Sequence, residues 1–209
     1  METRESRDVY KVYNKIATWF AQNRYTGLME KPRLDELIGL LLPNATVLDV
    51  GCGTGKPILD YLQSHGLSVT GLDASEEILK IARANFPQTE FVLQDMRKLD
   101  AGKQFDAIVA WHSFFHLPED DQPRVLELFA RHLKPKGLLM FTSGTQRGQA
   151  WGMNGGENLF HASLDTNEYE QILQNIGFKI LKYTVGDKAT GADVVWLAQL
   201  NTQTTPPAL

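Results

Sequence analysis

Between residues 46 and 143 the chain alternates short apolar, β-branched runs with amphipathic segments, and this rhythm constrains the fold more than any other feature. Strands separated by helices at this spacing predict βαβ units and a parallel sheet. The run FDAIVAW is almost continuously apolar, which is typical of a strand covered on both faces. The predicted strands cover 46–50, 68–73, 89–94, 105–111 and 137–143, with helices at 57–64, 76–85 and 121–133.

The segments on either side of residues 46–143 do not show this alternation. Apolar residues at three- and four-residue spacing predict an amphipathic helix over 6–24, and Pro32 opens a second helix that ends before Pro43. After residue 143 the rhythm breaks, and the glycines within 144–163 predict a loop.

The last part of the chain returns to regular structure. Asp165 and Glu168 have the spacing of a capping box at the start of a helix. Two strands, 178–185 and 193–200, then follow one another too closely for a parallel crossover, so we expect them to pair antiparallel. The expected organisation is a helical cap (1–45), a main domain (46–200) with a lid-like loop (144–163), and a flexible tail (201–209).

The stretch VLDVGCGTGKP carries glycine at every second position, at Gly51, Gly53 and Gly55, between a predicted strand and a predicted helix. Strand, glycine loop and helix together form a nucleotide-site geometry, in which the ligand lies at the carboxyl ends of the strands. Without Cβ atoms, the backbone can turn sharply and approach a ligand closely. The stretch therefore predicts a ligand site at this loop.

Two known glycine motifs do not fit this loop. A P-loop needs a glycine five positions before Gly55, where the chain has Val50, and Pro57 follows the lysine. The dinucleotide fingerprint needs glycine as its sixth residue, where the chain has Lys56. The glycine spacing is close to that of the dinucleotide fingerprint, but it matches neither motif.

Carboxylates end the next two predicted strands. Asp73 closes the second strand, where a carboxylate can accept hydrogen bonds from both hydroxyls of a ribose. Asp95 follows the third strand, where it can accept from an exocyclic amine of adenine. The pattern therefore indicates an adenosine-containing ligand.

With these features the chain resembles the class I S-adenosylmethionine-dependent methyltransferases. The resemblance covers residues 46–200 approximately and is carried, in order, by LDVGCGTG, GLDAS, EFVLQDM, FDAIVAWHSFFHL and LKPKGLLMF. It implies an α/β fold: a three-layer Rossmann-like sandwich whose mostly parallel seven-stranded sheet has an antiparallel last strand, preceded by an N-terminal helical extension. It also implies S-adenosyl-L-methionine as cofactor and a methyltransferase activity.

The resemblance assigns roles to particular residues. Asp49 would lie beneath the methionine amino group, Asp73 would hold the ribose, and Asp95 with Met96 would flank the adenine. Gly55 would permit close helix–strand packing. The cofactor-binding residues that it implies are Tyr13, Asp49, Gly51, Cys52, Gly53, Asp73, Ala74, Asp95, Met96, Trp111 and His112. No metal site is predicted.

Histidines are the candidates for a general base, which is needed only where the accepting atom carries a proton of high pKa. His112 and His116 follow the fourth strand on the ligand side and are the predicted catalytic residues, although a structural hydrogen-bonding role is favoured for His116. His65 and His132 fall near predicted helix ends and are expected at the surface. His161 is not assigned a place.

Charge and composition limit the kinds of partner that the protein is expected to bind. The net charge of −4 argues against a nucleic-acid partner, and the place of the Asp/Asn-Pro-Pro-Tyr motif of nucleic-acid methyltransferases reads AWHSFF. One cysteine, no apolar leader and no long apolar stretch predict a soluble, cytoplasmic protein without membrane contact. We therefore expect a small-molecule methyl acceptor; the sequence does not indicate its identity or an oligomeric state.

Two other functions stay open at this point. The first is a nicotinamide-dependent reductase, although the chain has no Tyr-x-x-x-Lys pair and about 45 residues precede the first predicted strand. The second is a non-catalytic module that binds S-adenosylmethionine and regulates a partner.

Overall fold

The structure is a computed structural model that describes residues 7–187 and 190–202. Its main sheet has seven strands in the order β3-β2-β1-β4-β5-β9-β8. The last strand, β9, pairs antiparallel with β5 and β8, whereas the other neighbours pair in parallel. This is the predicted sheet. The strands are β1 (Thr46–Val50), β2 (Ser68–Asp73), β3 (Glu90–Leu93), β4 (Phe105–Ala110), β5 (Leu133–Ser143), β8 (Phe178–Asp187) and β9 (Ala192–Leu200).

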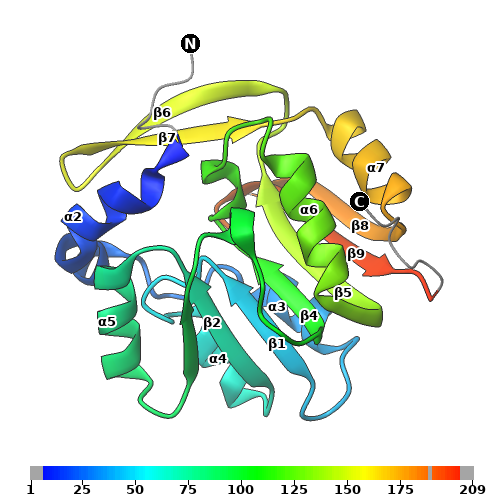
Figure 1. The fold of residues 1–209 in the computed structure, drawn as a ribbon, viewed down its shortest axis with the longest axis horizontal. Coiled ribbons are helices and arrows are strands. Elements are labelled where there is room, and N and C mark those ends of the chain that lie inside the picture. Colours follow the sequence, from blue (N-terminus) through cyan, green and yellow to red (C-terminus); the bar gives the residue numbers. More distant parts are fainter. Residues whose placement is uncertain (1–6, 188–189, 203–209) are drawn as a thin grey trace.

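Helices cover both faces of this sheet, which gives the predicted three layers (Figure 1). On one face α6 and α7 pack in a cluster with Phe141 and Trp196, and on the other α3 and α4 pack with Val109 and Met140. The α-helices are α2 (Val9–Asn23), α3 (Lys31–Ile38), α4 (Ile58–Ser64), α5 (Glu76–Asn85), α6 (Gln122–Arg131) and α7 (Thr166–Asn175).

The period of a strand explains these two cores. Along β1, Val47 belongs to the cluster under α3 and α4, whereas Leu48 and Val50 belong to the opposite cluster. All three side chains are fully buried. Each such burial stabilises the fold by about 1.5–3 kcal/mol, so a register slip by one residue would exchange the two faces at a large cost.

The segment 144–163 differs from its prediction. It is a two-stranded antiparallel ribbon of β6 (Gly148–Asn154) and β7 (Glu157–Ser163), and the predicted loop is wrong. Gly155 and Gly156 form the turn, with φ of 56° and 82°. Two adjacent residues with positive φ make the tight turn whose twist suits a β-hairpin.

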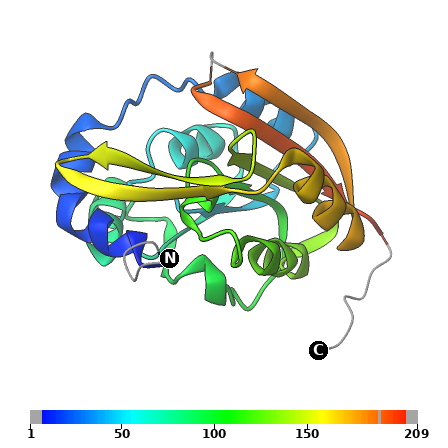
Figure 2. The same ribbon diagram turned by 90° about the horizontal axis from the view of Figure 1, so that it is seen from above.

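The ribbon and α2 lie side by side and cover the same edge of the sheet (Figure 2). They share a small apolar cluster, separate from the two main cores, in which Val9 of α2 packs with Leu159, Phe160 and Ala162 of β7. The tip of the ribbon approaches α2 so closely that a Cβ on Gly155 would lie 3.0 Å from Trp19. α2 and the ribbon therefore form one cover, built from two segments that lie far apart in the sequence.

Several predicted limits shift by a few residues. α2 begins at Val9 and β5 already begins at Leu133, while α3 ends at Ile38. Asp165 and Glu168 form the predicted capping box of α7. Residues 1–6 of the predicted cap and 203–209 of the predicted tail lie outside the described residues. Within the described part of the chain, the helices are too short or too polar to cross a membrane.

Candidate active site

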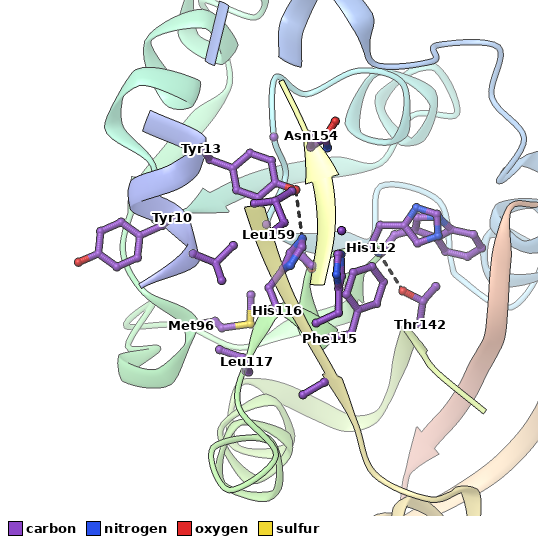
Figure 3. Close-up of a pocket in the computed structure, with 18 of the residues that line it drawn as sticks. Tyr10, Tyr13, Met96, His112, Phe115, His116, Leu117, Thr142, Asn154 and Leu159 are labelled. Atoms are coloured by element: carbon purple, nitrogen blue, oxygen red, sulfur yellow. Dashed lines mark hydrogen bonds between the residues drawn. The ribbon is translucent and has the colours of Figure 1, made fainter. Parts of the chain in front are cut away.

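A cavity of about 840 Å³ opens beneath the cover, at the carboxyl ends of β1, β2 and β4. The strand order reverses between β1 and β4, and ligands of open α/β sheets bind at such a switch point. Figure 3 shows side chains from α2, the β4 end and the ribbon converging there. Every site residue predicted from the sequence lines this cavity: Tyr13, Asp49, Gly51, Cys52, Gly53, Asp73, Ala74, Asp95, Met96, Trp111, His112 and His116.

The glycine loop is the floor of the cavity. Gly51 has a φ of 71°, and its N–H donates to the carbonyl of Leu72 at 2.7 Å, which ties the end of β1 to β2. A Cβ on Gly51 would lie 2.3 Å from the Cβ of Ser113, a distance that no packing can accommodate. A Cβ on Gly55 would meet the ring of Phe86, just after α5, so glycine is required there for close packing, as predicted.

Asp73 lies across this loop. Its carboxylate accepts from the N–H of Gly53 at 3.1 Å and from the N–H of Ser75 at 2.8 Å. Burial raises the pKa of Asp73, and these backbone donors oppose the rise. Each carboxylate oxygen keeps lone-pair capacity toward the cavity, which is what binding of two ribose hydroxyls requires.

Asp49 is a strongly perturbed carboxylate of the cavity. It is only 2% exposed, and its Oδ2 has no hydrogen-bond partner among the described residues. Burial, together with the charge of Asp73, raises the pKa of Asp49 to about 7. A buried acceptor without a partner is costly, and a cationic group placed in the cavity would satisfy it.

Asp95 differs from the simple expectation of a free acceptor. The guanidinium of Arg97 donates to both of its carboxylate oxygens, from Nε at 3.0 Å and 2.9 Å. Asp95 and Met96 do line the cavity, but the carboxylate already has a cationic partner. A contact with adenine therefore stays a prediction, and it would have to share Asp95 with Arg97.

His116 has both ring nitrogens engaged. Its Nδ1 lies 2.8 Å from the carbonyl of Phe160 on β7, and its Nε2 lies 3.1 Å from the hydroxyl of Tyr13 on α2 (Figure 3). A carbonyl only accepts, so Nδ1–H donates to Phe160 and Nε2 accepts from Tyr13. Burial lowers the pKa of His116 to about 3, so the ring is neutral. His116 joins α2 to the ribbon, which agrees with the structural role favoured for it.

His112 has a strained backbone, with φ of 50°, and its N–H donates to the hydroxyl of Thr142 at 2.9 Å. Strained backbone conformations of this kind cluster at functional sites. Burial lowers the pKa of His112 to about 4, although a ring hydrogen bond to the backbone of Gly191 acts to raise it. That bond occupies one ring nitrogen, and no hydrogen bond of the other occurs within the described residues.

Among the cavity residues that are absent from the sequence prediction are His161 and Arg24. His161 on β7 lies with its ring 4.8 Å from that of His116 and 5.2 Å from that of Phe115. Arg24, just after α2, lines the cavity and pairs at 3.1 Å with Glu30, which is almost fully buried. Asn154-Gly155-Gly156 is the hairpin signal that would have placed His161 on a strand, whereas the sequence has no signal for Arg24.

Of the other two histidines, His65 is exposed, as expected, whereas His132 is half-buried and its ring contacts the backbone of Leu128 and Ala101 at 2.8 Å and 3.2 Å. His65 and His132 occupy the carboxyl ends of α4 and α6. Within residues 7–187 and 190–202, no group of histidine, cysteine and carboxylate side chains has the arrangement to hold a metal ion.

Comparison with known proteins agrees with this geometry. Residues 47–137 match the methyltransferase domain family. The chain is 31% identical over 143 residues to a ubiquinone biosynthesis O-methyltransferase of Coxiella burnetii, covering 65% of this chain and 60% of that protein. It is 34% identical over 106 residues to the dTDP-4-amino-2,3,4,6-tetradeoxy-D-glucose N,N-dimethyltransferase of Saccharopolyspora spinosa, covering 49% and 42%. The chain thus spans less than two thirds of these curated relatives.

Among solved structures, the chain is similar to the 1,6-didemethyltoxoflavin-N1-methyltransferase of Burkholderia thailandensis. The TM-score is 0.72 at 20% identity, covering 92% of this chain and 87% of that one, which is a likeness of fold. The domain match, the curated relatives and the glycine loop at the switch point agree with one another. Residues 47–137 thus match the methyltransferase domain family, and the fold is similar to that of S-adenosylmethionine-dependent methyltransferases.

Proposed function

We propose that the protein binds S-adenosyl-L-methionine in this cavity and catalyses transfer of its methyl group to a small-molecule acceptor. The observation that carries the proposal is the unpartnered, buried Oδ2 of Asp49 beside the glycine loop. An amino-acid ammonium group would supply the missing hydrogen bond and the opposite charge. Relatives named for small-molecule methylation and the net charge of −4 support a small, non-nucleic-acid acceptor.

The residues present fit this cofactor at each of its parts. Asp49 would face the ammonium group and Arg24, with its charge held by Glu30, would face the carboxylate. Asp73 would bind the ribose hydroxyls, and Met96 would flank the adenine. Tyr13 and Phe20, whose rings meet edge to face at 5.3 Å, would offer aromatic surface to the sulfonium, worth about 0.5–2 kcal/mol.

When bound, the cofactor supplies an electrophilic methyl group whose bond to sulfur breaks as the bond to the acceptor forms. The protein mainly has to hold the acceptor in line, and such positioning can supply about 7–11 kcal/mol of the barrier. The cover of α2 and the ribbon excludes water from this step.

Where the accepting atom carries a proton, an imidazole beside the end of β4 can receive it. His112 has a ring nitrogen without a hydrogen bond within the described residues, and its low pKa keeps it unprotonated at neutral pH. His116 has no such nitrogen, because Phe160 and Tyr13 occupy both. His112 is therefore the proposed base, and His116 a positioning residue.

Calorimetric titration with S-adenosylmethionine tests the cofactor part of the proposal. Asp73→Ala is expected to weaken binding by about 1–3 kcal/mol, because a charged, two-point contact is lost. Asp60→Ala, in the first turn of α4 and outside the cavity, is the control and should leave the dissociation constant unchanged. An unchanged constant for Asp73→Ala would remove Asp73 from the site.

Transfer of a labelled methyl group into a pool of small metabolites tests the catalytic part. Label in an acceptor product supports a methyltransferase. Tight cofactor binding without transfer into any metabolite would instead favour the regulatory module, and binding of a nicotinamide dinucleotide in place of S-adenosylmethionine would favour the reductase.

A further inference from the structure

Five rings form a continuous surface at the acceptor side of the cavity: Tyr13, His112, Phe115, His116 and His161. We call it the aromatic wall. Neighbouring ring centroids lie 4.8–5.7 Å apart, from Tyr13 through His116, His161 and Phe115 to His112. All five residues line the cavity, and Figure 3 shows the rings of Tyr13, His116, Phe115 and His112 gathered around it.

The aromatic wall carries no formal charge at neutral pH. Burial lowers the pKa of His112 to about 4 and that of His116 to about 3, and it also lowers the pKa of His161. Burial raises the pKa of the Tyr13 hydroxyl. The wall therefore offers the faces and edges of neutral rings, which favour contact with another flat ring.

The free hydrogen-bonding capacity of the wall lies at His161 and at one ring nitrogen of His112. His116 has both nitrogens engaged by Phe160 and Tyr13. His161 is half-buried, and no hydrogen bond within the described residues reaches its ring nitrogens. Besides the ring nitrogen of His112, which would face the accepting atom, the wall thus offers His161 as a hydrogen-bonding edge for a polar substituent.

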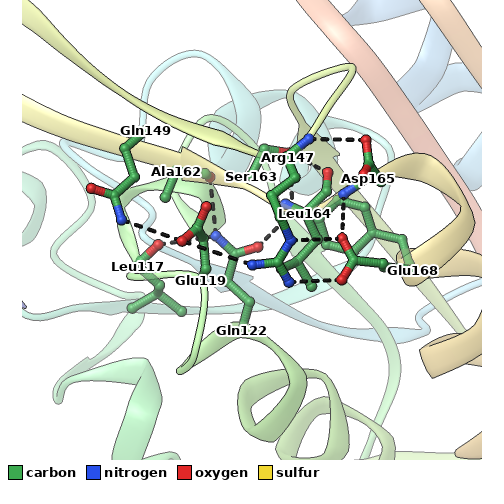
Figure 4. A network of polar contacts seen from close by, with 11 residues as sticks. Leu117, Glu119, Gln122, Arg147, Gln149, Ala162, Ser163, Leu164, Asp165 and Glu168 are labelled. Carbon is green, nitrogen blue, oxygen red and sulfur yellow. Dashed lines mark hydrogen bonds and ion pairs between the residues drawn. The ribbon is translucent and has the colours of Figure 1, made fainter.

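The charges around the cavity disfavour an anionic acceptor. Each of the four arginines that line it is already in an ion pair: Arg7 with Asp121, Arg24 with Glu30, Arg97 with Asp95 and Arg147 with Glu168. Figure 4 shows Arg147, directly before β6, paired with Glu168 and facing Glu119.

Two further charged side chains line the cavity. Asp193, on β9, is exposed and adds an unpaired carboxylate among the described residues. Lys56 belongs to the glycine loop and therefore to the cofactor end. An anionic acceptor would have to share an arginine with its carboxylate partner and would lie near Asp193, and an amine would have to lose its proton before it could accept a methyl group.

We propose that the acceptor is a planar, uncharged aromatic or heteroaromatic molecule that stacks on the aromatic wall, with its accepting atom at His112 and a polar ring substituent at His161. This rests on the proposed function, because the wall is an acceptor site only if the cofactor occupies the glycine loop. A cavity of 840 Å³ lies near the upper end of the range of about 300–1,000 Å³ for ligand pockets, which leaves space for two molecules.

Three matched probes test the ring and the charge separately. 1-Naphthol, its saturated analogue decahydro-1-naphthol, and 1-naphthyl phosphate are each titrated into the full chain saturated with S-adenosylhomocysteine. We expect 1-naphthol to bind at least tenfold more tightly than either of the others. Equal affinities, a preference for the saturated or phosphorylated probe, or no binding of 1-naphthol would overturn the inference.

Substitutions in the aromatic wall test whether 1-naphthol binds there. Phe115→Leu and His161→Leu should each weaken 1-naphthol binding at least fivefold and reduce its advantage over decahydro-1-naphthol, with the affinity for S-adenosylhomocysteine unchanged. Tyr183→Leu removes an exposed ring from the edge strand β8, outside the cavity, and should change neither affinity. Unchanged 1-naphthol affinity in both wall variants would contradict the inference.

The two proposals fail in distinguishable ways. If S-adenosylhomocysteine does not bind to the unmodified chain, the proposed function is wrong. If it binds and 1-naphthol shows no preference, only the acceptor class is wrong.

Discussion

The two ends of the cavity are built in opposite ways. The cofactor end consists of backbone and carboxylates at the ends of neighbouring strands, with Asp49, Gly51 and Asp73 within 25 residues of one another in sequence. The acceptor end consists of rings from three distant segments, at Tyr13, His112 to His116, and His161. The first is held by the sheet, whereas the second depends on a small separate cluster between α2 and β7.

This difference suggests where the molecule tolerates change. A rigid sheet edge positions a constant ligand, because parallel strands end together and cannot move independently. A cover with its own small core can be altered without disturbing the sheet, which suits the part of a site that must match one acceptor. Substitutions at the cofactor end should therefore lower the free energy of unfolding more than substitutions in the cover.

The largest effect is expected for Gly51→Ala. The new Cβ would lie 2.3 Å from the Cβ of Ser113 at a φ of 71°, so strain and overpacking add. We expect the free energy of unfolding to fall by about 2–5 kcal/mol in urea denaturation. Gly66→Ala is the matched control, since its φ is 76° with no atom within 4 Å of the new Cβ, and it should lose only about 1–2 kcal/mol. Equal losses at both glycines would show that close approach to Ser113 is unimportant.

Asp49 should couple stability and cofactor binding to pH in opposite directions. Its pKa is raised in the folded chain to about 7, so its ionisation destabilises the fold as the pH rises from about 4 to about 7. Asp49→Asn should therefore increase the free energy of unfolding at about pH 8 by about 1–3 kcal/mol, with no gain near pH 3.5. Urea denaturation at both pH values measures this.

The same group should make cofactor binding depend on pH. Between about pH 7 and pH 5 the ammonium group of the cofactor stays protonated while Asp49 loses its charge, so the dissociation constant should rise by up to about tenfold per unit. Asp49→Asn should bind weakly throughout and with a flatter pH profile. Asp73, whose pKa is also raised, would be implicated if the variant retained the full dependence.

At the cover, Tyr13→Phe removes the donor to Nε2 of His116 and leaves that nitrogen without its partner. The expected loss is about 1–2 kcal/mol in the free energy of unfolding. Tyr10→Phe is the control on the same helix: Tyr10 also lines the cavity, and no hydrogen bond of its hydroxyl occurs within the described residues. An equal loss of unfolding free energy for Tyr10→Phe would mean that the hydrogen bond between Tyr13 and His116 makes no specific contribution to stability.

The smallest effect is expected at the tip of the ribbon. Lys15 and Glu157 form an ion pair at 3.2 Å with both side chains well exposed, at 64% and 40%. Lys15→Ala should lower the free energy of unfolding by less than about 1 kcal/mol, and less still at high salt. A double-mutant cycle with Glu157→Ala measures the pair itself, and a coupling well above that limit would show that the ribbon depends on it.

Local signals predicted the cofactor end but not the acceptor end, and particular residues show why. Asp73 could be placed because it ends a strand next to the glycine loop. Phe114 and Phe115 are adjacent in SFF, yet Phe114 is fully buried in the main core whereas Phe115 lines the cavity. They lie in a short 3₁₀ helix, in which successive side chains point about 120° apart, and the sequence does not indicate which ring turns inward.

By itself the sequence determined the strand–helix alternation, the antiparallel pairing of the last two strands, and the set of residues at the sheet edge, while the seven-stranded sheet was implied by the family resemblance. These depend on period, turn chemistry and strand ends, which are local. Only the tertiary structure decided that 148–163 is a paired ribbon, that His116 connects it to Tyr13, and that His161 completes an aromatic wall. Those contacts join residues far apart in the chain, and burial of apolar surface between α2 and β7, rather than any local preference, brings them together.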